Sequence, residues 1–411
     1  MNIPTTLLQD KKVLLGVTGS IACYKSLELT RLFVKAGAEV RVVMSESAKK
    51  FIAPLTFETL TSNRVLDDTN ESWADDFNHI KITEWADIFL IAPVTANTMA
   101  KLAHGIADTM LLECALAHSG TKLLAPSANT NMLHNPITKE NLAVLERVDY
   151  QFINTQVKEL ACKTVGDGAM AEPIDIFWAT AKMLLKDEFW SGRDALVSGG
   201  GTLEKIDDVR FISNFSSGKM ASALATALYC KGANVKLIAT KFNTDLPANI
   251  SLTTVTSTEE MYTALVEQTK ASKQSTEKKP YLFMAAAVSD YIPSTTNEGK
   301  LKKDSIGQEW QLKLTKNRDI LALIDKKDIT VVGFKAEMDA ENAKKNATNM
   351  LDKKSIDAVC LNLLKDSRSF GTDTNEVEFI TKDTSVLIPS AQKLDIAFEI
   401  LKNASKLQES S

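Results

Sequence analysis

Residues 194–219 read DALVSGGGTLEKIDDVRFISNFSSGK, and this stretch decides the fold of the second half of the chain. DALVS has the length and apolar character of a buried strand, and MASALATALYCKG after the stretch predicts a helix that ends at Gly232. Three glycines and an SSGK step lie between these elements, so backbone N–H groups at the helix start can bind an anion. We therefore expect a nucleotide or phosphorylated-substrate site here, with an ordinary glycine-rich turn as the alternative.

The same stretch is not a Walker A loop. That pattern requires a glycine at 213 and a serine or threonine at 220, where this chain has Ser213 and Met220. The phosphate-binding composition therefore belongs to another kind of site.

A similar strand, glycine-rich turn, helix and strand open the first half. They are KVLLGVTGS (12–20), an amphipathic helix over about 21–36, and GAEVRVVMS (37–45), which parallel ALVSGGG, the SSGK helix and GANVKLIAT (232–240). Many α/β domains share this organisation, so the match predicts two Rossmann-like halves and does not require a duplication.

Further apolar segments predict an α/β fold with two doubly wound parallel sheets. A polar break, WSGRD, places the domain boundary near residue 190, which gives domains 1–189 and 190–411. The run TKASKQSTEKK (269–279) is interpreted as a solvated loop or a frayed helix end, and EVEFITKDTSVLIP (376–389) as a hairpin. The other strand candidates are residues 86–93, 121–126, 150–154, 281–288, 330–336 and 357–362.

Composition narrows the class of protein. The 411 residues are 44% hydrophobic and 24% charged, which is typical of a soluble protein of two domains. A net charge of −4 argues against a general nucleic-acid binder. The five cysteines form no CxxC pair, and no apolar run is long enough to span a membrane. We expect a cytoplasmic enzyme with neither a disulfide framework nor a zinc site.

Small and hydroxylated residues follow two strands of the first half. Thr18, Gly19 and Ser20 follow the first strand, and APVTANTMAK (92–101) follows the third. Both segments fall at the carboxyl edge of a doubly wound sheet, where ligands bind. Together they predict a cofactor crevice.

Two sets of motifs resemble known enzyme families. GVTGSIACYKS, NHIKITEWAD, APVTANTMAKLAHGIAD and APSANTNM, within residues 12–132, resemble the flavin-dependent homo-oligomeric cysteine decarboxylases. GGTLEKIDDVRFISNFSSGKM, AAAVSDY, KLKK and GFKAE, within residues 195–340, resemble phosphopantothenate–cysteine ligase. Their order is similar to that in the bifunctional phosphopantothenoylcysteine decarboxylase / phosphopantothenate–cysteine ligase of bacterial coenzyme A biosynthesis, across nearly the whole chain.

The resemblance implies roles for residues of the first half. His79 corresponds to an active-site histidine, Asn129 and Met132 to a segment that holds the substrate carboxylate, and Cys162 to an acid on a flap over the substrate. His79 and Asn129 have plainer alternatives, a surface histidine and a turn asparagine, whereas the position of Cys162 in a polar loop favours a reactive thiol. This chain departs from the family at Ala128, Lys163, Thr164 and Ala169. The FMN-binding residues implied are Thr18, Gly19, Ser20, Ala92, Thr95 and Asn97.

The implied reaction needs an electron sink, because direct loss of CO₂ would leave an unstabilised carbanion. FMN supplies this sink in the family. Oxidation of the thiol-bearing carbon gives a thioaldehyde, CO₂ leaves, and the resulting enethiolate regains a proton and a hydride.

The ligase resemblance implies a site for CTP, 4′-phosphopantothenate and Mg²⁺. Asn214 would stabilise an acyl-cytidylate and Lys300 would assist its formation or use, and cysteine then attacks it and releases CMP. Asp290 is a tentative Mg²⁺ ligand, with a turn aspartate as the alternative, and Arg318 replaces a proline of the family. The other residues implied are Gly200, Gly201, Arg210, Ser216, Ser217, Gly218, Lys219, Lys302, Lys303, Asn317, Phe334 and Lys335.

Two alternative functions stay open. The flavodomain is degenerate in the first, while the ligase is active; the second is a flavin-binding regulatory subunit. By analogy with these families we also expect homo-oligomers, with trimers of the flavodomain and dimers of the ligase domain.

Overall fold

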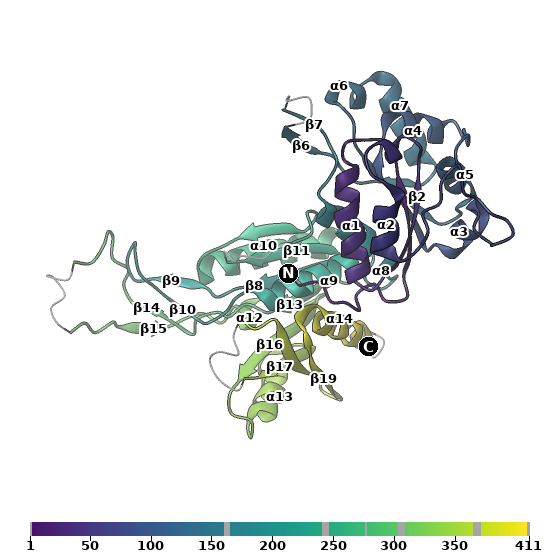
Figure 1. The fold of residues 1–411 in the computed structure, drawn as a ribbon. Helices are drawn as coiled ribbons and strands as arrows, with labels where there is room; N and C mark the ends of the chain where they lie inside the picture. Colours follow the sequence, from purple (N-terminus) through teal and green to yellow (C-terminus); the bar gives the residue numbers. More distant parts are fainter. Residues whose placement is uncertain are drawn as a thin grey trace. The chain divides into compact units, whose positions relative to one another are not determined.

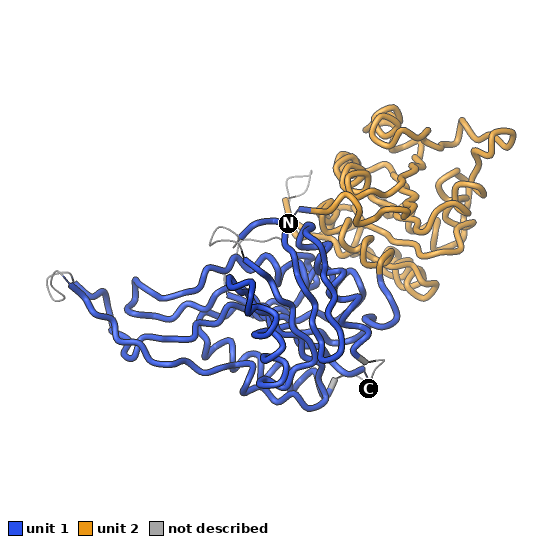
Figure 2. The backbone as a smooth tube through the Cα atoms, turned by 90° about the horizontal axis from the view of Figure 1, so that it is seen from below, with its two compact units in different colours: residues 1–2, 186–411 blue, residues 3–185 orange. Residues whose placement is uncertain are grey.

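The computed structural model describes residues 2–159, 165–240, 246–275, 278–302, 309–364 and 371–408. The chain divides into two compact units, residues 3–185 and residues 186–411, the latter together with residues 1–2 (Figure 2). No helix in the described part of the chain is both long and apolar enough to cross a membrane.

The unit of residues 3–185 is built on a parallel sheet with the strand order β2-β1-β3-β4-β5 (Figure 1). Its central strand is buried along its whole length, as expected for a parallel strand covered on both faces. The predicted doubly wound fold is confirmed for this half. The strands are β1 Lys12–Val17, β2 Glu39–Met44, β3 Ile88–Val94, β4 Thr121–Pro126 and β5 Tyr150–Phe152.

Helices of this unit pack their apolar residues against the sheet. The core includes Leu14, Phe89 and Leu124, none of which is exposed to solvent. The predicted helix over 21–36 is α1. The helices are α1 Cys23–Lys35, α2 Pro54–Thr61, α3 His79–Trp85, α4 Ala96–Ala103, α5 Met110–Ala117, α6 Thr130–Leu133, α7 Pro136–Arg147 and α8 Pro173–Leu185, with a short 3₁₀ helix, Ala48–Lys50.

An antiparallel hairpin replaces part of the loop that was expected around residue 162. β6 Gln156–Glu159 pairs with β7 Val165–Ala169, with Gln156 opposite Ala169 and Glu159 opposite Val165. Its composition, rich in glycine and polar residues, gave no strand signal, because neither strand alternates clearly between apolar and polar residues. Cys162, Lys163 and Thr164 lie outside the described residues.

The second unit contains an eight-stranded sheet with the order β12-β11-β8-β13-β16-β17-β18-β19. The first six strands are parallel, and β18 and β19 form the antiparallel hairpin that the sequence predicts. The α/β, doubly wound prediction is therefore confirmed for this half too, with an antiparallel extension. The strands are β8 Asp194–Gly199, β11 Asn234–Ala239, β12 Ser251–Thr254, β13 Tyr281–Met284, β16 Thr330–Glu337, β17 Ala358–Leu363, β18 Thr374–Ile380 and β19 Ser385–Gln392.

Residues 269–275 form the last turns of helix α10, as the helix-end interpretation of the run 269–279 expects, and residues 276 and 277 lie outside the described residues. Helix α9 begins at Lys219, directly after the SSG step. The helices of this unit are α9 Lys219–Cys230, α10 Thr258–Ser275, α12 Ile320–Leu323, α13 Ala343–Lys354 and α14 Lys393–Ala404, with a terminal 3₁₀ helix, Ser405–Gln408.

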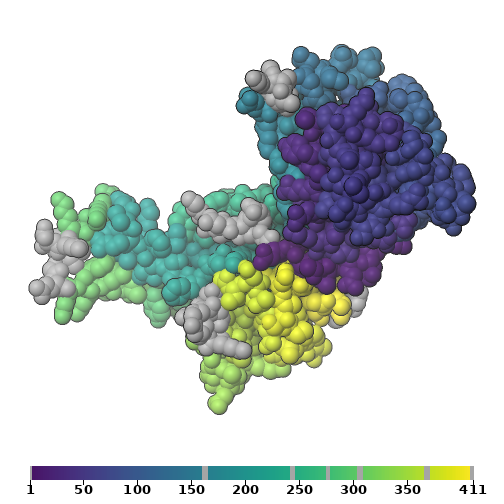
Figure 3. All heavy atoms as spheres, in the orientation of Figure 1, coloured from purple at the N-terminus to yellow at the C-terminus, as the bar shows by residue number. Residues whose placement is uncertain are grey.

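Two short antiparallel ribbons project from this sheet as an arm (Figures 1 and 3). One pairs β9 Leu203–Lys205 with β10 Phe211–Ser213, and the other pairs β14 Tyr291–Pro293 with β15 Leu314–Lys316. The sequence analysis missed all four strands, because each has only three residues and lies inside a segment dominated by turn residues. We refer to these two ribbons and their connecting turns as the arm.

Candidate functional site

The glycine-rich stretch lies at the switch point of the second sheet. The six parallel strands follow the order 3-2-1-4-5-6, so the strand order reverses between β8 and β13, and ligands of such sheets bind at that crevice. The loops after these two strands are joined: the Ala287 N–H donates to the Gly200 carbonyl at 2.8 Å, and the Thr202 N–H donates to the Ala287 carbonyl at 3.2 Å. The fold therefore brings the AAAVSDY segment and the glycine triplet to the same edge of the sheet, at the carboxyl ends of β8 and β13.

All three glycines of the triplet are required by geometry, and a Cβ on Gly199 would lie 2.5 Å from the Ala221 Cβ. Gly200 has φ of +79°, and a Cβ there would lie 1.9 Å from the Thr240 hydroxyl oxygen. A Cβ on Gly201 would lie 2.8 Å from the Asn214 carbonyl oxygen. The glycines therefore let the loop after β8 pack closely against its neighbours.

A cavity of about 200 Å³ opens at the N-terminus of α9. Its walls bring together six of the residues predicted to bind CTP and 4′-phosphopantothenate: Ser216, Ser217, Gly218, Lys219, Phe334 and Lys335. The Lys219 ammonium donates to Asp373 at 2.6 Å and to the Gly371 carbonyl at 2.7 Å. A helix start with adjacent lysines is suited to bind a polyphosphate.

Lys393, at the start of α14, also lines this cavity and was missed by the sequence analysis. Burial, followed by the charge of Lys219, lowers the pKa of Lys393. Its ammonium also donates to the Thr372 carbonyl. The residue lies 174 positions after Lys219 (393 − 219), outside any motif, so only the fold could place it here.

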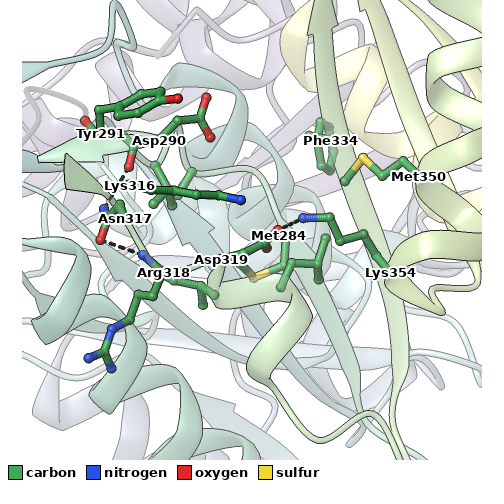
Figure 4. Close-up of a pocket in the computed structure, with 15 residues that line it drawn as sticks. Met284, Asp290, Tyr291, Lys316, Asn317, Arg318, Asp319, Phe334, Met350 and Lys354 are labelled. Atoms are coloured by element: carbon green, nitrogen blue, oxygen red, sulfur yellow. Dashed lines mark hydrogen bonds and ion pairs between the residues drawn. The ribbon is translucent and has the colours of Figure 1, made fainter. Parts of the chain in front are cut away.

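A second cavity, of about 430 Å³, adjoins the first and shares Ala286 and Phe334 with it (Figure 4). Its walls are partly apolar, through Met284 and Met350, and Asp290 lies at its rim. Burial lowers the pKa of Lys354, which also forms an ion pair with Asp319. The remaining lining residues are Val288, Ser289, Tyr291, Lys316, Asn317, Arg318, Ile320 and Leu321.

Asn317 connects the second cavity to the sheet edge. Its amide donates to the Ser289 carbonyl at 2.7 Å and to the Thr258 hydroxyl at 2.9 Å, and its backbone N–H donates to the Asp290 carbonyl at 2.8 Å. These bonds indicate that Asn317 shapes the wall of the site.

Arg318 turns away from the second cavity, as Figure 4 shows. Its guanidinium pairs with Glu259 at 2.9 Å and lies over the ring of Tyr262, 5.1 Å from the centroid. The replacement of the family proline therefore adds a contact to α10 and places no cation in the cavity.

Three predicted ligase residues line neither cavity: Arg210, Lys300 and Lys302. The Arg210 guanidinium donates to Asp207 at 2.6 Å and to the Leu301 carbonyl at 2.9 Å, so it supports the arm next to Lys300. Lys303 lies outside the described residues.

Asp207 holds the arm together. This buried carboxylate accepts the Arg210 guanidinium and the backbone N–H groups of Val209, Arg210 and Leu301, at distances of 2.6 to 3.2 Å. Hydrogen bonds from Arg210, followed by those from the backbone, hold the pKa of Asp207 well below its usual range. Asn214 lies where the arm returns to the sheet, and its amide donates to the Val288 carbonyl at 3.0 Å.

The residues predicted to bind flavin lie at the switch point of the first sheet, between β1 and β3. The Thr18 hydroxyl donates to the Pro93 carbonyl at 2.8 Å and accepts the Thr95 N–H at 3.1 Å. The hydroxyl oxygens of Ser20 and Ser127 are 3.0 Å apart. These bonds connect the ends of β1, β3 and β4 and present several hydroxyls at one edge.

The other predicted flavin residues lie close to the same edge. The Ala92 carbonyl accepts the Ser26 hydroxyl at 2.7 Å, and Asn97 is exposed in the first turn of α4. A Cβ on Gly19 would lie 2.4 Å from the Ser47 Cβ, so the loop needs glycine there.

A cavity of about 600 Å³ lies between this edge and the β6–β7 hairpin. Ser20, Ser127, Asn129 and Ala169 are among the residues that line it. Asn129 caps α6, since its side-chain oxygen accepts the Asn131 N–H at 2.9 Å. The departures at Ala128 and Ala169 leave small side chains in this wall, and Met132 is exposed.

Ion pairs hold the hairpin against the unit. His134 Nε2 lies 2.6 Å from the Asp167 carboxylate, and Lys25 donates to Glu172 at 3.0 Å, which also pairs with Lys158. The sequence analysis left His134 unassigned, because its partner lies 33 positions away.

His79 lies at the first position of α3, and Asn129 precedes α6, in a different part of the same unit (Figure 1). The Nδ1 atom of His79 is 2.7 Å from the Oε1 atom of Glu71. His79 does not line the cavity that contains Asn129. Within one copy of the chain, the two predicted catalytic residues are therefore not brought together.

The four described cysteines are all buried. Burial raises the pKa of the Cys23, Cys114 and Cys360 thiols, so these three are poor acids and nucleophiles. Within the described ranges, no group of three or more His, Cys, Asp or Glu side chains is arranged to hold a metal ion.

Comparison with known protein families first defines the class. Residues 1–185 match the family described as Flavoprotein, and residues 190–407 match the family described as DNA/pantothenate metabolism flavoprotein C-terminal domain. The chain is therefore a two-domain flavoprotein of pantothenate metabolism.

Full-length relatives identify the family. The coenzyme A biosynthesis bifunctional protein CoaBC of Bacillus subtilis is 37% identical over 411 residues, which are 98% of each chain. That of Haemophilus influenzae is 35% identical over 96% of this chain and 97% of its own. A solved C-terminal domain of a CoaBC protein is 28% identical, covers 55% of this chain and 100% of its own, and has a TM-score of 0.44. This chain belongs to the CoaBC family, and it is a bifunctional enzyme of coenzyme A biosynthesis with a decarboxylase half and a ligase half.

Proposed function

We propose that the second unit joins cysteine to 4′-phosphopantothenate with CTP, and that the first unit decarboxylates the product to 4′-phosphopantetheine. The observation that carries this proposal is the lysine-lined cavity at the N-terminus of α9, at the switch point of the ligase sheet. Activation of a carboxylate by a nucleotide needs cations at the leaving pyrophosphate. Lys219, Lys335 and Lys393 supply them.

In this proposal the two adjoining cavities divide the ligase substrates. The lysine-lined cavity accepts the phosphates, and the larger cavity, with Met284 and Met350 in its wall, accepts the less charged portion of a substrate. Asn214 lies at the arm's return to the sheet, where an amide donor stabilises the acyl-cytidylate.

Mg²⁺ would bind through Asp290 and the substrate phosphates. Magnesium sites at nucleotides commonly use only one or two carboxylates, together with waters and phosphate oxygens. An exposed aspartate at the rim of the larger cavity fits that requirement.

The first unit would bind FMN at the switch point between β1 and β3. The hydroxyls of Ser20 and Thr95 and the N-termini of α1 and α4 provide donors for a phosphate, while the buried Thr18 hydroxyl holds the two loops together. The order 2-1-3-4-5 is that of flavodoxin-like folds, which bind FMN at this point. The donor set therefore fits the cofactor. When bound, FMN supplies the electron sink that decarboxylation requires.

The chain's own groups bind and protonate in this scheme. Asn129 faces the cavity under the hairpin and would hold the substrate carboxylate. His79 would exchange a proton with the substrate, and Cys162 would return one to the enethiolate. The four described cysteines are all buried, so Cys162 is the proposed acid.

Homo-oligomers would complete both sites. The arm exposes Val209, Phe211, Tyr291, Trp310 and Leu314, and short ribbons with exposed apolar side chains need a covering surface. A second copy on the arm would also bring Lys300 to a ligase cavity. In the flavodomain, a neighbouring copy would bring a second His79 to the cavity that contains Asn129.

The test is to supply purified protein with 4′-phosphopantothenate, cysteine, CTP and Mg²⁺, and to follow CMP and CO₂ together. The proposal expects both products in equal amounts, and a bound flavin absorbance. CMP without CO₂ would support the second candidate, an active ligase with a degenerate flavodomain. The small side chains at Ala128 and Ala169 are the observation that favours that candidate.

A further inference from the structure

A carboxylate next to His79 is unassigned by any motif. The Glu71 Oε1 oxygen lies 2.7 Å from His79 Nδ1, and the same oxygen accepts the backbone N–H of His79 at 3.3 Å. One carboxylate oxygen thus contacts both the ring and the backbone of the residue that begins α3. Both side chains are about three-quarters buried, with exposed fractions of 22% for His79 and 25% for Glu71.

The backbone around Glu71 is fixed on both sides. The preceding residue, Asn70, accepts the Asp67 N–H on its side-chain oxygen at 3.0 Å. The following residue, Ser72, exchanges two backbone hydrogen bonds with Phe77, at 2.8 and 2.9 Å. Glu71 is therefore presented by an ordered loop, and its carboxylate position is part of the fold.

Other groups around the imidazole leave Glu71 as its direct partner. Trp73 lies edge-on to the ring, with 5.8 Å between centroids. Glu113, on α5, is 3.7 Å from Nδ1, which is beyond hydrogen-bond distance, so it contributes charge only. The Nδ1 side of the ring is thus occupied by a carboxylate, and Nε2 lies on the other side of the ring.

We propose that Glu71 is a positioning residue for His79, which holds the proton on Nδ1 and leaves Nε2 to exchange a proton with the substrate of the decarboxylase. This inference rests on the proposed role of His79. A neutral imidazole has one donor and one acceptor nitrogen, and the hydrogen bond made by one nitrogen decides the state of the other. A proton accepted at Nε2 gives an imidazolium, whose charge the Glu71 carboxylate balances, and no other bond changes.

The tautomer gives a test that does not depend on turnover. The chain has four histidines, so ¹⁵N-histidine NMR of the flavin-loaded protein is simple to assign, with His79→Gln identifying the signal. At a pH where the ring is neutral, we expect a protonated Nδ1 and an unprotonated Nε2, and Glu71→Ala should move the proton toward Nε2. A wild-type ring protonated on Nε2, or an unchanged signal in Glu71→Ala, would overturn the proposal.

Kinetics give the second test. We expect Glu71→Ala to lower the decarboxylation kcat by about 10- to 100-fold with little change in KM, since general acid–base catalysis contributes about 10²–10⁴-fold. Glu71→Asp should recover part of the rate. The control is Glu84→Ala on α3, the helix that begins with His79; the Glu84 carboxylate is 60% exposed and pairs with Lys81, so this variant should leave kcat unchanged.

Two readouts separate the possible failures. Retained ligase activity and flavin absorbance show that the variant is folded. If His79→Gln decarboxylates at the wild-type rate, the proposed role of His79 is wrong and the positioning role of Glu71 falls with it. If His79→Gln is impaired while Glu71→Ala has wild-type kcat, only the positioning role is overturned.

Discussion

The two switch points of this molecule are built to different degrees by one copy of the chain. In the ligase unit, β8, β13 and α9 bring most of the predicted phosphate-binding residues to the walls of two adjoining cavities. In the flavodomain, the cavity contains Asn129 but not His79. The difference teaches that one copy of the chain gathers residues that follow strands at a sheet edge, whereas it leaves His79 on α3 and Lys300 on the arm outside these cavities.

The largest effect should come from Cys162→Ser. Removal of the proposed acid should lower decarboxylation by at least about 10²-fold, because proton transfer to the enethiolate loses its donor. CO₂ release and CMP release are measured in one reaction, and CMP should be unaffected. Ser replacement at the buried Cys23 is the control for a general effect of losing a thiol. If Cys162→Ser released CO₂ at the wild-type rate, Cys162 would not be the acid of the decarboxylation.

Gly200→Ala should destabilise the ligase unit by about 3–5 kcal/mol, which is the range of severe steric changes. Gly200 has a positive φ, and its Cβ would collide with Thr240. Gly192→Ala is the matched control, because Gly192 has φ of +72° but nothing within 4 Å of its Cβ. That control should lose only about 1–2 kcal/mol.

Urea unfolding of both variants measures this difference. Equal losses for Gly200→Ala and Gly192→Ala would show that the close packing at the ligase switch point is not the reason for its glycine.

Lys393→Met should raise the KM for CTP by about tenfold, since one charge-assisted contact is worth about 1.5–3 kcal/mol and part of it is screened. Lys402→Met is the control on the same helix, because Lys402 is 66% exposed and pairs with Glu399. Steady-state CMP release gives the constants. An unchanged KM for CTP would show that Lys393 does not bind the nucleotide.

The smallest effect concerns the arm and pH. The folded pKa of Asp207 is lowered, chiefly by Arg210, so its stabilising contribution is complete above the unfolded pKa near 3.9 and is lost as pH falls through the folded value. Asp207→Asn should therefore flatten the acid limb of the stability curve below about pH 4. Thermal unfolding against pH measures it; Asp208→Asn, whose carboxylate accepts the Gly299 N–H, is the comparison. If the stability of Asp207→Asn fell with pH as steeply as that of the wild type, the protonation of Asp207 would not be the cause of the acid limb.

The sequence predicted the central strands of both sheets, because long buried parallel strands have a strong apolar signal. It also predicted the glycine-rich cradle, since three glycines and SSGK lie within the single stretch 199–219 between a strand and a helix. Lys393 and Glu71 could not be predicted in the same way. One is placed at the α9 cavity by the packing of the C-terminal helix, and the other meets His79 only through the turn that holds residues 72–77. The short strands of the arm and the flap hairpin were hidden by turn residues.

The central claim is that one chain performs consecutive reactions at two switch points. The most direct test follows purified protein with 4′-phosphopantothenate, cysteine, CTP and Mg²⁺, and with added FMN. The account predicts one CO₂ for each CMP in the wild type, and CMP with no CO₂ in Cys162→Ser. CMP without CO₂ in the wild type, despite bound flavin, would contradict it.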